Sequence, residues 1–199
     1  MEDIRIEEHY IQVFIRINEL LKQDDDRLIT VAIDGMSGSG KSFLSCLLAD
    51  RYECNVFHMD DYFLPLEMRA EKRLDEPGGN VHYERVKEEV LNPLRENRPV
   101  ICRAYSCGDW KYSEPRIIEA KRLNIIEGSY SMHPYLREAY DLSVFLEIEK
   151  EEQIRRIILR DPDRSVQPFI NRWIPLENKY FNELNIRSYC DIVLDTTAF

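Results

Sequence analysis

The sequence has no long apolar run, and none of its hydrophobic stretches approaches the roughly 20 residues that a membrane-spanning helix needs. Its first residues are acidic and lack the pattern of a signal peptide. Cysteine is scarce, with five scattered residues and no C-x-x-C pair. We therefore expect a cytoplasmic protein with reduced thiols, without a membrane partner and without cysteine-bound zinc.

Positive charge is also in short supply. The chain has 27 Lys and Arg against 37 Asp and Glu, which gives a formal net charge of −10. A nucleic-acid footprint would be basic, so we predict no nucleic-acid partner. A polyanionic ligand would need a local cluster of cations in such a chain. With 199 residues, 44% of them hydrophobic, the sequence predicts a single domain over 1–199.

Glycine is rare, yet three of the seven glycines fall within residues 35–42. The octet Gly35-Met36-Ser37-Gly38-Ser39-Gly40-Lys41-Ser42 matches the phosphate-binding pattern G-x-x-x-x-G-K-[ST] at every fixed position. Glycine allows the tight turn that points backbone N–H groups inward at an anion. Lys41 should reach the terminal phosphates of ATP or GTP, and the Ser42 hydroxyl should bind Mg²⁺. We predict that the octet, with Phe43 after it, binds this nucleotide.

The sequence around the octet supports this prediction. Residues 28–34 form an apolar, β-rich run typical of a buried parallel strand. Apolar residues then repeat at helical spacing over 43–48. Strand, loop and helix therefore follow in the order that a phosphate loop needs. The alternative is a turn between strand and helix that binds nothing.

Two adjacent carboxylates follow the second predicted strand, residues 54–58. In open α/β sheets, ligands bind beyond the carboxyl ends of the strands, where the phosphate loop also lies. We therefore predict that Asp60 is a general base on an attacking hydroxyl, with Asp61 beside it. A helix N-cap or turn aspartate is the alternative.

Another buried strand, residues 122–128, ends in an acid. P-loop enzymes often place a carboxylate at such a strand end, where it holds Mg²⁺ directly or through water. The predicted metal ligands are accordingly Ser42, Glu127 and Asp60.

The cation cluster that the chain otherwise lacks lies near its C-terminal third. The predicted helix 149–160 carries Arg155, Arg156 and Arg160, and Arg164 follows just beyond. Arginine forks match phosphate geometry, so we predict an arginine-bearing lid over about 161–168 that closes on the nucleotide. A solvated helix face is the alternative.

Aromatic residues gather over 105–112, after a predicted strand at 99–105. Tyr105, Trp110 and Tyr112 can stack on a base, or they can pack as the tip of a hairpin that pairs back through 116–120. The residues alone leave both readings open.

The remaining elements complete an α/β pattern. Residues 1–27 should hold an N-terminal helix over 3–22, ending in an acidic break at 24–26. Its predicted apolar stripe runs through Ile4, Tyr10, Ile11, Phe14, Ile15, Asn18 and Leu21. Further helices are predicted at 82–91, 133–139 and 168–187, and strands at 142–147 and 191–194. Alternating strands and helices predict a three-layer fold, a five-stranded parallel sheet covered by helices on both faces.

Several segments resemble the uridine kinase family of P-loop kinases, which includes relatives acting on nicotinamide riboside, pantothenate and ribulose phosphate. They occur in the family's order and at similar spacing: Met59-Asp60-Asp61-Tyr62-Phe63, Leu74-Asp75-Glu76-Pro77, Ile126-Glu127-Gly128, Ile154-Arg155-Arg156 and Leu159-Arg160-Asp161. The resemblance runs from about Leu28 to Thr197 and implies a kinase that uses ATP or GTP with Mg²⁺.

The resemblance also implies roles for single residues. Asp60 corresponds to the base on the ribose 5′-hydroxyl, Phe63 to a pocket aromatic, Asp75 to the ligand of ribose hydroxyls and Tyr105 to the contact with the base. The phosphate-binding arginines correspond to Arg156, Arg160 and Arg164.

Two positions depart from the family pattern. Phe63 stands where uridine kinases usually have Tyr, and Trp110 stands near a family His. The acceptor therefore stays open between a nucleoside such as uridine or cytidine and another small alcohol, such as nicotinamide riboside or pantothenate. A nucleotide-binding switch without an acceptor is the hypothesis from another class, and a homo-oligomer is also open.

Overall fold

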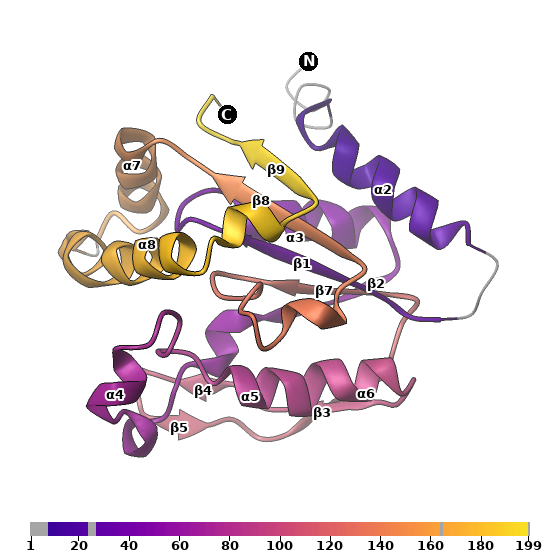
Figure 1. Cartoon of the computed structure of the whole chain (residues 1–199), viewed down its shortest axis with the longest axis horizontal. Helices are drawn as coiled ribbons and strands as arrows, with labels where there is room; N and C mark the ends of the chain where they lie inside the picture. The colour runs from indigo at the N-terminus through magenta and orange to yellow at the C-terminus, as the bar shows by residue number, and fades with distance from the viewer. Residues whose placement is uncertain (1–7, 24–26, 164, 199) are drawn as a thin grey trace.

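A five-stranded parallel sheet forms the centre of the structure (Figure 1), a computed structural model that describes residues 8–23, 27–163 and 165–198. Its strands are β1 (Ile29–Gly35), β2 (Cys54–His58), β7 (Leu123–Glu127), β8 (Leu142–Glu147) and β9 (Ile192–Asp195). They lie in the order β2-β7-β1-β8-β9, and every neighbouring pair is parallel. The predicted five-stranded parallel sheet is confirmed. Ile4, the break at 24–26 and Arg164 lie outside the described residues.

Helices cover both faces of this sheet (Figure 1). The α-helices of the described residues are α2 (Ile11–Leu21), α3 (Lys41–Arg51), α4 (Glu71–Leu74), α5 (Tyr83–Val86), α6 (Asn92–Arg95), α7 (Lys150–Arg160) and α8 (Ile174–Glu183), of which α4 lies away from the central sheet, beside β4 and β5 (Figure 1). Val31 and Ile33 of β1 share a core with α2 and α3, whereas Ala32 between them belongs to the core under α5, α6 and α8. Side chains alternate across a strand, so β1 is apolar on both faces.

The face of the N-terminal helix that packs on the sheet differs from the prediction. Ile11 and Ile15 are 47% and 49% exposed. The buried stripe of α2 and the residue before it consists of Tyr10, Val13, Phe14, Ile17 and Leu20. Apolar residues are so frequent in this segment that two overlapping stripes satisfy helical spacing, and packing on the sheet selects one of them.

The predicted helix at 133–139 is wrong. The segment consists of turns and a short 3₁₀ stretch, Arg137–Ala139. Two of its backbone bonds connect residues three apart, from the Leu136 N–H to the His133 carbonyl and from the Ala139 N–H to the Leu136 carbonyl. One bond, from the Arg137 N–H to the His133 carbonyl, connects residues four apart, but it is not continued into an α-helix, and Pro134 lacks an N–H.

The predicted strand at 99–105 lies outside the central sheet. Its core, β3 (Val100–Cys102), pairs antiparallel with β6 (Arg116–Ile118), as the predicted hairpin requires. Further out, β4 (Tyr105–Ser106) pairs with β5 (Lys111–Tyr112). This hairpin brings the aromatic segment toward the turn that follows β2.

Two predicted helices include a π-helical turn. Residues Lys87–Leu91 join α5 to α6, and Phe169–Trp173 lead into α8. The helix predicted over 82–91 therefore extends to Arg95, and α8 ends at Glu183. Among the described residues, every helix is too short or too polar to cross a bilayer.

Candidate active site

The phosphate loop joins the end of β1 to the start of α3. Gly35 has a φ of +143°, and a Cβ there would lie 2.2 Å from the carbonyl oxygen of Leu146, so glycine is required. Lys41 begins α3, and its Nζ donates to the carbonyls of Gly35 at 2.8 Å and Met36 at 3.0 Å. The ammonium therefore lies against the loop itself. The eight residues form the strand–loop–helix unit that the motif predicts.

A cleft of about 770 Å³ opens beside this loop. It is lined by Ser37, Gly38, Gly40, Lys41, Ser42, Phe43, Asp60, Phe63, Glu127, Gly128, Ser129, Tyr130, Arg156, Arg160, Ser165, Pro168, Phe169, Trp173 and Glu177. Its size suits a small-molecule ligand such as a nucleotide. The cleft thus gathers most of the residues predicted to bind phosphates and metal.

Glu127 lies at the end of β7, next to the phosphate loop. Both of its carboxylate oxygens are 3.4 Å from Ser42 Oγ, and its Oε1 is 2.5 Å from His58 Nδ1. The hydrogen bond that His58 donates to Glu127 raises the pKa of His58, although burial opposes the shift. Mg²⁺ prefers hydroxyl and carboxylate oxygens and takes its remaining ligands from water and phosphates. Ser42 and Glu127 lie within 3.4 Å of each other and Asp60 lines the same cleft, so the oxygens are of the kind that Mg²⁺ prefers, and metal binding by this set stays a prediction.

Asp60 lies on a 3₁₀ turn, Met59–Tyr62, that follows β2 directly. Enclosure within the cleft raises the pKa of Asp60, and the nearby carboxylates of Glu127 and Glu177 raise it further, whereas Lys41 lowers it. Asp61 points elsewhere and forms an ion pair with Arg116 of β6 at 3.2 Å. The two neighbouring aspartates therefore have different surroundings.

A second hollow of about 430 Å³ lies between this turn and the hairpin. It is lined by Asp60, Asp61, Phe63, Ala104, Tyr105, Ser106, Cys107, Asp109, Lys111, Tyr112 and Ser113. The rings of Tyr105 and Tyr112 lie 5.0 Å apart, and Tyr105 is buried. Asp60 and Phe63 line both hollows, so one carboxylate faces the phosphate loop and the aromatic pocket together.

Trp110 and Asp75 lie apart from the described lining of both hollows. Trp110 has a φ of +58° and is 44% exposed, and the Arg69 guanidinium lies 4.9 Å from its ring. Asp75 is exposed, and its carbonyl accepts a hydrogen bond from Lys179 of α8 at 2.6 Å. Their roles in substrate binding stay predictions.

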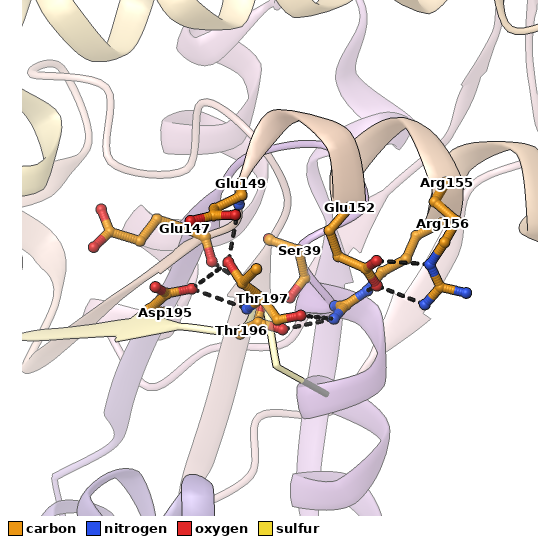
Figure 2. A network of polar contacts seen from close by, with 9 residues as sticks. All are labelled: Ser39, Glu147, Glu149, Glu152, Arg155, Arg156, Asp195, Thr196 and Thr197. Carbon is orange, nitrogen blue, oxygen red and sulfur yellow. Dashed lines mark hydrogen bonds and ion pairs between the residues drawn. The ribbon is translucent and has the colours of Figure 1, made fainter.

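Arg155 and Arg156 of α7 lie close to Glu152, and Arg156 also contacts the chain after β9 (Figure 2). Arg156 donates to Glu152 at 2.7 Å and to the Thr196 carbonyl at 2.6 Å. Thr196 in turn donates to the carbonyl of Ser39 in the phosphate loop at 3.0 Å. Hydrogen bonds from Arg155 and Arg156 lower the pKa of Glu152 to about 2. The chain after β9 therefore connects α7 to the loop.

Arg160, at the end of α7, lines the cleft, and its guanidinium lies 5.4 Å from the ring of Phe169. Arg156 lines the same cleft. Both therefore lie beside the predicted nucleotide site.

Sequence reasoning missed three acidic or basic residues at this site. Asp34 is fully buried, and its carboxylate accepts from the N–H groups of Gly35 and Met132 and from the Tyr180 hydroxyl. Burial raises the pKa of Asp34 to about 6. An acid inside an apolar strand was a visible signal for Asp34. His58 and Glu177 carried no signal, because their partners are distant in sequence.

A phosphate loop between the central strand of a parallel sheet and the helix that follows it is the nucleotide-binding arrangement of P-loop proteins in general. No family model matches the sequence. A possible uridine kinase from Bacillus stearothermophilus has a similar structure, with a TM-score of 0.65 and 21% identity over 92% of this chain and 100% of that chain.

Two curated relatives are similar in sequence. A uridine kinase of Clostridium botulinum (strain Okra / Type B1) is 23% identical over 192 residues, 84% of this chain and 88% of the relative. Inorganic pyrophosphatase TTM1 of Arabidopsis thaliana is 29% identical over 160 residues, which are 77% of this chain but only 24% of the plant protein. The chain therefore has the P-loop kinase fold, and the predicted resemblance to the uridine kinase-like family is confirmed.

Proposed function

We propose that the protein transfers the γ-phosphoryl group of ATP or GTP to a hydroxyl of a small molecule, namely the ribose 5′-hydroxyl of a nucleoside such as uridine or cytidine. The observation that carries the proposal is the position of Asp60, which lines both the phosphate-loop cleft and the aromatic hollow. A nucleotide-binding switch needs no second pocket beside its phosphate site, so this arrangement favours a kinase.

The steps follow from the residues at the junction. Asp60 accepts the proton of the acceptor hydroxyl as its oxygen bonds to the γ-phosphorus, and the nucleoside diphosphate leaves with the electrons of the broken P–O bond. Lys41 and the loop N–H groups hold the phosphates and stabilise the developing charge. Bound Mg²⁺, held by Ser42 and Glu127, would neutralise part of the phosphate charge. Enclosure by the lid keeps water from competing with the acceptor.

The charge of the second hollow bears on the acceptor class. Its charged lining comprises Asp60, Asp61 and Asp109 against Lys111, and Asp61 forms an ion pair with Arg116. Such a hollow suits an uncharged nucleoside and disfavours an acceptor that carries a carboxylate or a phosphate. Its aromatic rings offer stacking surfaces for a base. The same acidic lining supports a second candidate, a cationic alcohol such as nicotinamide riboside.

A panel of acceptors tests the proposal. ADP release by the purified full chain would be measured with ATP and Mg²⁺, alone and with uridine, cytidine, nicotinamide riboside or pantothenate. We expect ADP release to depend on an uncharged or cationic acceptor and to stay near background with anionic pantothenate. Absence of any acceptor-dependent ADP release, together with tight ATP binding, would favour the switch.

A further inference from the structure

We propose that Glu177 is a positioning residue of the nucleotide site, which fixes the phosphate loop through Ser37. The proposal rests on the proposed function only in requiring that the loop binds a polyphosphate. Glu177 belongs to α8, whereas Ser37 lies 140 residues earlier in the chain.

Both carboxylate oxygens of Glu177 accept hydrogen bonds from Ser37. Oε2 accepts the Ser37 N–H at 2.9 Å, and Oε1 accepts the Ser37 hydroxyl at 2.6 Å. The Ser129 hydroxyl lies 2.9 Å from the same Oε1. Glu177 is only 5% exposed, so these bonds form away from bulk water. Hydrogen bonds to a carboxylate are roughly twice as strong as neutral ones.

A second helix holds the remaining polar group of Ser37. Gln153 of α7 is 1% exposed and donates from Nε2 to the Ser37 carbonyl at 2.9 Å. The N–H, hydroxyl and carbonyl of this one loop residue are therefore all bonded to side chains. A loop with glycines at 35, 38 and 40 is intrinsically permissive, and fixing it costs conformational entropy. Contacts that fix the loop before the nucleotide binds reduce the conformational-entropy cost of binding.

The two helices that hold Ser37, α7 and α8, are joined by the segment between Arg160 and Phe169. Helix α7 ends at Arg160, and the π-helical turn before α8 begins at Phe169, so the segment between them includes the predicted lid, 161–168. Phe169 and Trp173 line the nucleotide cleft, and Trp173 lies 5.6 Å from the ring of Phe63. The helix that carries Glu177 is therefore preceded by a turn whose aromatic side chains line the same cleft.

The charge of Glu177 gives it two opposite possible effects on nucleotide binding. Within the described part of the chain, no Lys or Arg forms an ion pair with Glu177. A buried carboxylate next to a polyphosphate site is costly unless hydrogen bonds offset the burial. If Glu177 instead competed with the phosphates for the loop, removal of its carboxylate would increase nucleotide affinity. The two roles therefore predict opposite changes in affinity.

Calorimetric titration of the full chain with ATP and Mg²⁺ tests the proposal. Loss of two charge-assisted hydrogen bonds should weaken ATP binding by about tenfold or more in Glu177→Ala. Glu183→Ala removes the same charge from an exposed position on α8 and should leave ATP affinity unchanged. Ile17→Ala, in α2 and remote from the cleft, lowers stability and should also leave affinity unchanged.

Three results would overturn the proposal. These are unchanged or tighter ATP binding by Glu177→Ala, an equal loss in Ile17→Ala at the same drop in melting temperature, or an equal loss in Glu183→Ala. A double variant, Ser37→Ala with Glu177→Ala, should bind ATP no more weakly than Glu177→Ala alone, and additive losses would contradict the route through Ser37. A wild-type chain that binds ATP but phosphorylates no acceptor would overturn the proposed function and leave this binding test intact.

Discussion

The Tyr180 hydroxyl of α8 donates a 2.8 Å hydrogen bond to the carboxylate of Asp34, which lies at the end of β1 in the buried centre of the fold. The same carboxylate accepts the N–H groups of Gly35 and Met132. One acidic side chain thus joins the central strand, the start of the phosphate loop, the segment after β7 and α8. The ends of these elements are fixed relative to one another at the site.

Asp34 should give folding stability a distinct pH dependence. Its pKa is raised from 3.8 to about 6 by burial, so the folded state holds the proton more tightly than the unfolded state does. The contribution of Asp34 to stability is therefore fully present below about pH 4 and is lost as pH rises to about 6. The loss amounts to about 3 kcal/mol in the free energy of unfolding, from a shift of about two units.

Urea unfolding of the wild type and of Asp34→Asn, measured from pH 4 to 7, tests this expectation. The variant should be less stable overall, because its amide nitrogen cannot accept the surrounding donors. The difference in free energy of unfolding between the wild type and Asp34→Asn should shrink as pH rises from about 4 to 6. Only the wild type has a titrating group at this position that loses stability. A difference that stays constant would contradict the assignment.

Lys41→Ala should abolish phosphoryl transfer and leave the fold intact. The Lys41 ammonium bonds to carbonyls of the phosphate loop and lies at the surface of the cleft, so its removal opens no core cavity. Loss of a cation that stabilises transition-state charge costs about 3 to 4 kcal/mol in barrier, by analogy with a single oxyanion-hole donor. Acceptor-dependent ADP release and the melting temperature are the two measurements. Full activity in a folded variant would rule out the phosphate-loop assignment.

Asp60→Asn should lower turnover by about 10²–10⁴-fold, because asparagine can orient a hydroxyl but cannot take its proton. ATP affinity, measured by calorimetry, should change little, since Lys41 and the loop N–H groups remain. Asp61→Asn is the matched control and should have a milder effect, because its carboxylate pairs with Arg116. The opposite ranking would reverse the roles of the two aspartates, and lost ATP affinity in Asp60→Asn would make Asp60 a metal ligand instead.

The pH profile offers a further measurement on the wild type. A base must be deprotonated to act, and the pKa of Asp60 is raised by enclosure. The acid limb of the kcat/KM profile, which reports the free enzyme, should therefore lie above the ordinary range of an aspartate. An acid limb at or below that range would contradict general-base catalysis by this group.

The N-terminal helix offers a paired test of packing. Ile17 is fully buried in α2, and Ile15 on the same helix is 49% exposed. Ile17→Ala should lower the free energy of unfolding by about 2 to 5 kcal/mol, the range for large-to-small changes in a core. Ile15→Ala should change it by less than about 1 kcal/mol. Equal losses of free energy of unfolding in the two variants, measured by urea unfolding, would contradict the burial of the α2 face that contains Ile17.

Local patterns in the sequence determined most of the sheet and the phosphate loop. Strands 54–58, 122–128, 142–147 and 191–194 are short apolar runs, and each lies in the central sheet within a residue or two of its predicted bounds. The octet from Gly35 to Ser42 could be predicted because a tight, glycine-rich anion loop has a strict residue pattern.

Only the tertiary structure decided which partners meet across the chain. Helical spacing left two stripes for α2, and contact with the sheet selected the one through Ile17. Local sequence carries no information on which distant residues pair. The hydrogen bonds between Glu177 and Ser37 and between His58 and Glu127 therefore could not be predicted. Asp34 was visible as an acid in an apolar strand, but its partners lie about 100 and 146 residues away. The residue types follow from the sequence, whereas their pairing depends on how the parallel sheet brings strand ends and α8 together.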